Sequence, residues 1–165
     1  MTELEVFIRQ ATQGDLASVM AIERASFSDP WSTESFETSL TLERFRFLVA
    51  ESAEQVSVGQ TSSSGAPRLA GYVIALLLGS EGEVADLAVD PEMRGQGVGA
   101  RLLDAVLDQA RSDGVRTFYL EVRESNESAR RLYHSRSFVV VGRRRGYYQQ
   151  PPEDALVLRR DNNPT

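Results

Sequence analysis

The order of apolar and polar residues along the chain follows two periods, and each period predicts one kind of secondary structure. Alternating apolar and polar residues, or a short apolar run between turn residues, predict a strand, whereas apolar residues three and four positions apart predict a helix. Strands are predicted at Val6–Gln10, Phe45–Glu51, Arg68–Leu78, Glu83–Val89, Arg116–Val122, Phe138–Tyr148 and Asp154–Arg160. Helices are predicted at Leu16–Phe27, Phe36–Leu42, Val98–Ala110 and Glu127–Arg136. This order predicts one α/β domain, a mixed sheet of about seven strands flanked by about four helices.

Capping and turn residues support these boundaries. Thr12 followed by Asp15 has the pattern of a capping box at the start of the first helix, and Ser32 or Thr33 can cap the second helix. Residues 52–67 are rich in Ser, Gly and Gln and have no apolar period. This composition predicts a flexible hairpin loop.

The length of 165 residues fits a single domain with its own core, and no repeat or linker divides the chain. We therefore expect residues 1–165 to form one domain, with residues 161–165 as a disordered tail. The net charge of −6 is uneven, because residues 1–90 are strongly acidic and residues 91–165 carry a positive excess. The acidic half suits a basic partner, and the basic half suits an anionic ligand.

The composition excludes several kinds of chemistry. The chain has no cysteine, which removes disulfides, thiolate metal sites and a cysteine nucleophile. With His134 as its single histidine, no metal is expected. No signal-peptide pattern and no apolar run of membrane-spanning length are present, so a cytoplasmic protein without a membrane partner is expected.

A glycine-rich loop, Arg94-Gly95-Gln96-Gly97-Val98-Gly99-Ala100, stands between a predicted strand and a predicted helix. Glycine lets backbone N–H groups turn inward and lets a ligand approach without a Cβ in the way. The helix beginning near Val98 directs its free N–H groups and its positive dipole end into the same space. Together these features predict a site for a phosphate or pyrophosphate.

Three interpretations of this loop remain open on its chemistry alone. Gly95-x-Gly97-x-x-Ala100 fits a dinucleotide fingerprint with Glu121 as its acidic residue, although residues 90–94 separate the loop from its strand and no βαβ unit precedes it. A purely structural glycine-rich turn is the second interpretation. In the third, Arg94-x-x-Gly97-x-Gly99 after Val89-Asp90-Pro91 resembles the acetyl-CoA pyrophosphate loop of the GNAT superfamily of N-acetyltransferases.

The resemblance to the GNAT superfamily extends over nearly the whole chain except residues 52–67. The stretch from Leu120 to Phe138 carries L-E-V-R-x-S-N-x-x-A-x-x-L-Y-x-x-x-x-F, which resembles the second half of a GNAT acetyl-CoA site and, more narrowly, the RimI-type alanine N-acetyltransferases of bacteria. Supporting segments are Pro30-Trp31-Ser32, Tyr147-Tyr148 and Glu153-Asp154-Ala155. The chain departs from the family pattern at His134, at the basic run Arg143-Arg144-Arg145 and at Ser137, where the family has glycine and a left-handed residue is expected.

The resemblance implies a mostly antiparallel, twisted sheet and a specific reaction. RimI-type enzymes transfer an acetyl group from acetyl-CoA to the N-terminal alanine of a small-subunit ribosomal protein, so acetyl-CoA and that protein's N-terminal tail are the expected partners. Because no cysteine can accept the acetyl group, direct transfer in a ternary complex is expected. We expect no stable nucleic-acid binding, and a monomer or weak dimer.

The resemblance also assigns the catalytic groups. Glu121 corresponds to the general base, and an α-amine with a pKa of about 7.7–8.0 requires only a modest base, through water if necessary. Tyr133 corresponds to the general acid that protonates the leaving thiolate. From spacing alone, Glu121 could be an ordinary surface carboxylate and Tyr133 a core residue.

Other residues are expected to hold acetyl-CoA. The backbone of the predicted fourth strand should pair with the pantetheine arm, and an N–H near Val89 should bind the thioester oxygen as charge develops there. Asn126 could hold the same arm, or act only as a helix N-cap. The expected cofactor-binding set is Leu87, Ala88, Val89, Arg94, Gly95, Gln96, Gly97, Val98, Gly99, Ala100 and Asn126.

The acceptor side is expected to be formed by Trp31, Tyr147 and Tyr148 with the acidic first half of the chain. Trp31 is expected to be a wall of this site more than a direct contact. His134 is expected on an exposed helix surface. The basic run at Arg143 is expected on an exposed edge strand, from which it could also reach cofactor phosphate or ribosomal RNA.

Rival functions remain open at this point. The acceptor could be an internal lysine, another protein N-terminus, a polyamine or an antibiotic amine. The chain could also be a non-catalytic module that binds acetyl-CoA, although the presence of both Glu121 and Tyr133 argues against a silent site. A dinucleotide-binding protein is the most distant alternative.

Overall fold

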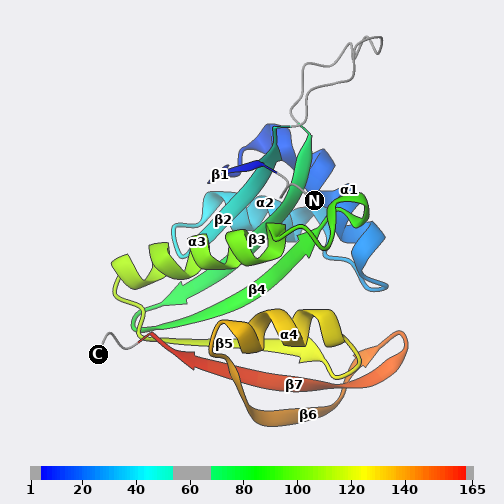
Figure 1. The fold of residues 1–165 in the computed structure, drawn as a ribbon, viewed down its shortest axis with the longest axis vertical. Helices are drawn as coiled ribbons and strands as arrows, with labels where there is room; N and C mark the ends of the chain where they lie inside the picture. The colour runs from blue at the N-terminus through cyan, green and yellow to red at the C-terminus, as the bar shows by residue number, and fades with distance from the viewer. Residues whose placement is uncertain (1–4, 54–67, 163–165) are drawn as a thin grey trace.

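The computed structural model describes residues 5–53 and 68–162, which form one sheet with helices on both faces (Figure 1). The strands are β1 (Val6–Gln10), β2 (Phe45–Ser52), β3 (Leu69–Leu78), β4 (Glu81–Val89), β5 (Thr117–Arg123), β6 (Val139–Gln149) and β7 (Pro152–Asp161). The helices are α1 (Leu16–Ser26), α2 (Thr33–Thr41), α3 (Val98–Ser112) and α4 (Glu127–Ser135), with short 3-10 turns at Gln13–Asp15 and Pro91–Met93. In the described part of the chain, no helix has both the length and the apolar character needed to span a membrane.

The strands lie side by side in the order β1-β2-β3-β4-β5-β7-β6. All neighbouring strands are antiparallel except β4 and β5, which are parallel. A parallel pair needs a long crossover, and α3 provides it between β4 and β5. The predicted α/β fold, with a mixed and mostly antiparallel sheet, is therefore confirmed.

Two apolar cores lie on opposite faces of the sheet. One core packs α3 and α4 against one face and contains Leu102 and Tyr133. The other packs α1 and α2 against the opposite face and contains Val19 and Phe36. Because side chains alternate along β5, its residues Phe118, Leu120 and Val122 enter the α3–α4 core, and Glu121 lies on the face of α1 and α2.

The predicted helix boundaries follow from side-chain caps. The Ser32 hydroxyl accepts the Ser35 N–H at 3.1 Å at the start of α2. At the start of the first helical segment, the Thr12 N–H donates to the Asp15 carboxylate at 2.8 Å, as half of a capping box requires. Ser137, after α4, has a φ of 69°, which confirms the left-handed residue expected at this position.

Two predicted irregular segments are shorter than expected. The tail was predicted to begin at residue 161, but Asp161 belongs to β7, and the Asn162 N–H donates to the Arg116 carbonyl. Ser52, predicted to start the flexible loop, ends β2 and donates its N–H to the Arg68 carbonyl at 2.8 Å. The remainder of each segment, residues 54–67 and 163–165, lies outside the described residues.

Gly71 allows β3 to approach β4 closely. A Cβ at this position would lie 2.7 Å from the Ala88 carbonyl oxygen and 3.3 Å from the Val89 Cα, both backbone atoms. We expect Gly71→Ala to lower the free energy of unfolding by about 1–3 kcal/mol, measured by urea denaturation. Gly142→Ala is the control, because its Cβ would meet Val157 at an ordinary 3.8 Å. Equal effects of the two substitutions would contradict this account.

Candidate functional site

The centre of the candidate site is the point where β4 and β5 separate. The two strands pair only from Glu81 with Thr117 to Glu83 with Tyr119, and β4 then continues to Val89 without β5 beside it (Figure 1). Past that point β5 pairs with β7 on its other side. Beyond Glu83, the β4 edge that faces β5 therefore has backbone groups without a strand partner in the part of the chain that the structure describes, as expected for binding an extended arm.

The glycine-rich loop lies at the end of β4 and leads into α3. Gly95 and Gly97 have φ values of 76° and 83°, in the left-handed region that favours glycine. Gly97 is the N-cap of α3, and no side chain of the described residues caps this end of the helix. The first N–H groups of α3 are thus available to an anion, which fits the predicted pyrophosphate site. Val98 is buried, whereas Gly99 and Ala100 are half-buried.

Arg94 makes contacts that the sequence did not predict. Its Nε donates to the Val89 carbonyl at 3.0 Å, and its guanidinium also donates to the Ser26 hydroxyl at 2.9 Å. These bonds tie the loop to the ends of β4 and α1. Gln96, also in the predicted set, is half-buried.

Glu121 lies on β5 at the separation of the strands and has partners from β6. Its carboxylate forms an ion pair with Arg144 Nε at 2.8 Å, and its side chain is 19% exposed. A hydrogen bond between Tyr147 and Glu121 is the main cause that raises the pKa of Tyr147 to about 12. Partial desolvation, followed by the charge of Glu121, raises the pKa of the neighbouring Glu83. Glu121 is therefore a partly accessible carboxylate within a polar cluster and not an isolated surface group.

Tyr148 is held next to this cluster. The guanidinium of Arg123 lies 4.2 Å from the centre of the Tyr148 ring and also donates to Glu153 at 3.1 Å. Burial and then the charge of Glu121 raise the pKa of Tyr148. The rings of Tyr147 and Tyr148 meet edge to face at 5.0 Å. The structure thus brings Glu121, Tyr147 and Tyr148 together.

Tyr133 reaches the site from α4. It is buried, and its ring packs edge to face on Phe138 at 5.6 Å. Burial, followed by the charges of Asp86 and Tyr148, raises the pKa of Tyr133, so its hydroxyl keeps its proton at neutral pH. Asp86 of β4 and Tyr148 of β6 are therefore the groups whose charges act on the Tyr133 hydroxyl. Both the core-packing interpretation and a chemical role are compatible with this position.

Asn126 caps α4, which is the structural role that the sequence analysis gave as the alternative to holding the pantetheine arm. Its side-chain oxygen accepts the Ala129 N–H at 3.2 Å and so caps α4. This bond uses the amide oxygen and leaves the amide N–H groups for another partner.

A buried acidic cluster was missed by the sequence analysis. Glu23 of α1 is only 1% exposed, and its carboxylate accepts the Trp31 backbone N–H at 3.1 Å and the Tyr72 hydroxyl. Asp86 of β4 lies 3.4 Å from the same hydroxyl. Burial, then the hydrogen bond with Glu23 and the charge of Glu23, raises the pKa of Asp86 to about 9. A signal was present in the sequence, because Glu23 and Asp86 stand at positions where the periods of α1 and β4 require an apolar residue.

The raised pKa of Asp86 predicts how the free energy of unfolding depends on pH. Between about pH 4, where an unfolded aspartate ionises, and about pH 9, the folded chain keeps a proton that the unfolded chain loses. Stability should therefore fall as pH rises through this window, by up to about 1.4 kcal/mol per pH unit for one proton. Asp86→Asn cannot ionise and should remove this part of the slope in urea unfolding measured over a pH series. Parallel stability profiles for the two proteins would contradict the assignment.

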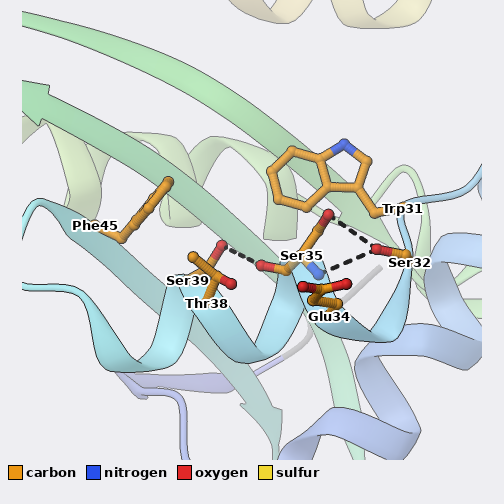
Figure 2. Close-up of a pocket in the computed structure, with 7 residues that line it drawn as sticks. All are labelled: Trp31, Ser32, Glu34, Ser35, Thr38, Ser39 and Phe45. Atoms are coloured by element: carbon orange, nitrogen blue, oxygen red, sulfur yellow. Dashed lines mark hydrogen bonds between the residues drawn. The ribbon is translucent and has the colours of Figure 1, made fainter.

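Trp31 stands at the entrance to α2. Its ring packs on Phe36 at 5.5 Å, and a cavity of about 320 Å³ lies along α2 beside it (Figure 2). The residues lining this cavity are Trp31, Ser32, Glu34, Ser35, Thr38, Ser39 and Phe45. The preceding turn reaches across the molecule, because the Ser28 hydroxyl donates to the Gln150 carbonyl beside Tyr148. The turn before Trp31 is therefore joined to the segment after Tyr148 through the bond from Ser28 to Gln150, and the Trp31 ring itself packs on Phe36.

The remaining predicted residues lie as expected, with one exception. His134 is exposed on α4. Arg143, Arg144 and Arg145 are exposed on the edge strand β6. The exception is that two of them are neutralised by carboxylates: Arg143 bonds Glu124 at 2.7 Å, and Arg144 bonds the predicted base. Within residues 5–53 and 68–162, no group of three His, Cys, Asp or Glu side chains could hold a metal ion.

Comparisons with known proteins agree with this geometry. The model of the acetyltransferase (GNAT) family matches residues 16–138. The chain is 35% identical to the N-alpha-acetyltransferase RimI of Mycobacterium tuberculosis over 95% of this chain and 93% of that protein. It is 30% identical to the ribosomal protein bS18-alanine N-acetyltransferase of Escherichia coli over 87% of this chain and 89% of that protein.

A solved structure has the same fold. The crystal structure of the ribosomal-protein-S18-alanine N-acetyltransferase from Escherichia coli superposes with a TM-score of 0.81 at 29% identity and covers 98% of this chain and 96% of that chain. The open strand edge, the uncapped helix start and the family match agree with one another. The chain belongs to the acetyltransferase (GNAT) family and is an N-acetyltransferase with acetyl-CoA as its co-substrate.

Proposed function

We propose that this enzyme acetylates the N-terminal α-amine of a small-subunit ribosomal protein that begins with alanine. Relatives covering most of the chain carry names that state this activity. The observation that carries the proposal is the position of Glu121, a partly accessible carboxylate at the separation of β4 and β5, with Tyr147 and Tyr148 beside it.

The residues that would hold acetyl-CoA belong to β4, the glycine-rich loop and α4. The N–H groups at the start of α3 suit the pyrophosphate, and the free edge of β4 from Leu87 to Val89 suits the pantetheine arm. Bound acetyl-CoA supplies the thioester that the amine attacks. A backbone N–H near Val89 would donate to the thioester oxygen as negative charge develops there. Asn126 would add an amide donor to the same arm.

Two side chains would handle the protons. Glu121 takes the proton that the amine nitrogen loses, directly or through one water, and Tyr133 donates its hydroxyl proton to the departing thiolate. Glu121 is on the acceptor face of the sheet, whereas Tyr133 projects from α4 on the other face, so the acid and the base approach from opposite sides. Without a cysteine to hold the acetyl group, transfer is direct in a ternary complex.

The acceptor peptide would lie between the turn before α2 and the end of β6. Trp31 forms one wall, and Tyr147 and Tyr148 form the other. The bond from Ser28 to Gln150 joins the turn before Trp31 to the segment after Tyr148, so the acceptor would enter beside two connected segments. Such an entrance would favour a chain end over an amine in the middle of a folded surface.

The test measures acetyl transfer from acetyl-CoA to three acceptors. These are a peptide copying an alanine-first ribosomal N-terminus, the same peptide with a blocked N-terminus and an internal lysine, and a small polyamine. We expect transfer to the free α-amine only. Transfer to the lysine peptide or the polyamine would instead support another acceptor class. Normal acetyl-CoA binding without transfer to any of the three would support a non-catalytic module.

A further inference from the structure

The buried cluster of Glu23, Tyr72 and Asp86 joins four parts of the chain around the site. Glu23 comes from α1, Tyr72 from β3 and Asp86 from β4, and the Trp31 backbone comes from the turn before α2. All three side chains are buried, with exposed fractions of 1%, 0% and 8%. The mechanism proposed above does not use any of them.

The charge of this cluster is not balanced by a cation. Among the described residues, no Arg and no histidine forms an ion pair with Glu23 or Asp86. Two buried carboxyl groups in hydrogen-bond contact cannot both be ionised without a large electrostatic cost. The pair therefore keeps one proton at neutral pH, in agreement with the raised pKa of Asp86.

With that proton in place, the hydrogen bonds are complete. The Asp86 carboxyl donates to the Glu23 carboxylate, which also accepts the Tyr72 hydroxyl and the Trp31 N–H. Burial and the two neighbouring carboxyls raise the pKa of Tyr72, so it remains a donor. Two further groups face Asp86: the Leu87 backbone N–H donates to it, and Tyr133 lies within reach of its charge.

The Trp31 segment is the part of this network that borders the acceptor side. The Glu23 carboxylate fixes the Trp31 backbone, Ser32 then caps α2, and Ser28 contacts the carbonyl of Gln150. A second negative charge on Asp86 would repel Glu23 and weaken its hold on this segment. Among the described residues, the glycine-rich loop and α3 do not bond to either carboxyl, so the part of the acetyl-CoA site proposed for the pyrophosphate would be spared.

We propose that Glu23 is a positioning residue for the acceptor, and that it holds the Trp31 segment in place only while it shares a single proton with Asp86. The part of this inference that concerns the acceptor rests on the proposed function. The part that concerns the Trp31 segment does not.

The first experiment uses Trp31 as a probe, because it is the only tryptophan in the chain. We expect its fluorescence to change with pH in the unmodified protein, with a midpoint near pH 9 set by Asp86. Asp86→Asn keeps an amide donor to Glu23 and cannot ionise, so this transition should be absent. Ionisation of the tyrosines is common to both proteins and cancels in the comparison. An unchanged signal in the unmodified protein, or the same transition in both proteins, would overturn the proposal.

Tyr72→Phe provides a second variant if Asp86→Asn fails to fold. The Tyr72 hydroxyl donates to the Glu23 carboxylate and lies 3.4 Å from Asp86, so its removal takes away a donor that stabilises the charged form of the pair and should move the fluorescence midpoint to higher pH. A midpoint that stays in place or moves to lower pH would contradict the network.

The second experiment measures the KM of the alanine-first peptide and the KM of acetyl-CoA between about pH 7 and about pH 10. In the unmodified enzyme, the peptide KM should rise by about tenfold relative to Asp86→Asn above the midpoint, the effect of losing about one hydrogen bond to a charged group. The acetyl-CoA KM should differ much less between the two enzymes, because the pyrophosphate part of its site, in the chain as the structure describes it, does not bond to the cluster. Parallel changes in both KM values would overturn the positioning role. If no peptide is acetylated, the proposed function fails, and the fluorescence result still decides the proposal for Glu23.

Discussion

A Glu121→Gln enzyme is expected to acetylate an alanine-first peptide about 10²- to 10⁴-fold more slowly than the unmodified enzyme. Glutamine has nearly the same shape and can still bond Tyr147, but it cannot accept the amine proton. The substitution also leaves Arg144 without its 2.8 Å ion-pair partner. Because Arg144 is exposed, that loss should have little effect on stability.

The pH dependence of the residual rate distinguishes a base from a binding group. Without a base, the rate of the variant should depend on the fraction of peptide whose α-amine is already neutral more strongly than the rate of the unmodified enzyme does. The rate of the variant should therefore rise steeply as the pH approaches the α-amine pKa of about 7.7–8.0. Glu124→Gln is the matched control, since this neighbouring carboxylate pairs with Arg143 on the surface. If the Glu121→Gln enzyme is no slower than the Glu124→Gln control, or differs from the unmodified enzyme only in peptide KM, Glu121 is not the general base.

The second large effect is expected for Tyr133→Phe, which removes only the hydroxyl. The ring would keep its edge-to-face contact with Phe138, so folding should be preserved. We expect kcat to fall by about 10²-fold, because the thiolate must then leave without a proton donor. The KM for acetyl-CoA should change little, because binding of the cofactor does not require this proton. Steady-state rates with both substrates varied provide the measurement.

Tyr119→Phe is the control for this change. Tyr119 lies on β5 near Arg159, at 5.8 Å from its guanidinium, and has no place in the proposed reaction. An acetyl-CoA analogue with a better leaving group should restore part of the rate of Tyr133→Phe and none of the rate of Glu121→Gln. If the analogue restores neither or both equally, the hydroxyl is not the acid.

The pattern of apolar and polar residues was sufficient to predict the helices and strands and their order. A strand or helix that packs on a core buries at least one face, and that face requires apolar residues at the period of the element. Val19 and Leu102 enter the cores predicted for their helices, and Ser32 caps α2 where a cap was expected. Local signals of this kind depend on neighbours only a few residues away in the sequence.

The contacts of the site were less predictable because they join distant elements. Arg144 of β6 forms its ion pair with Glu121 of β5 beside a shift in the pairing of β6 and β7 between Arg144 and Tyr148, and no local pattern indicates that irregularity. Glu23 and Asp86 are separated by the whole of α2, β2 and β3. Each appeared in the sequence as an acid in an apolar position, but only the fold shows that they meet.

The narrow connection between β4 and β5 also has a thermodynamic consequence. Strand pairing connects the β1–β4 half of the described sheet to the β5–β7 half through only three residue pairs. A ligand that lies along the remaining edge of β4 binds the folded chain alone, so its binding free energy adds to the free energy of unfolding. At a free acetyl-CoA concentration 100 times its Kd, this contribution is about 2.7 kcal/mol. The folded fraction of the enzyme therefore rises and falls with the supply of its own co-substrate.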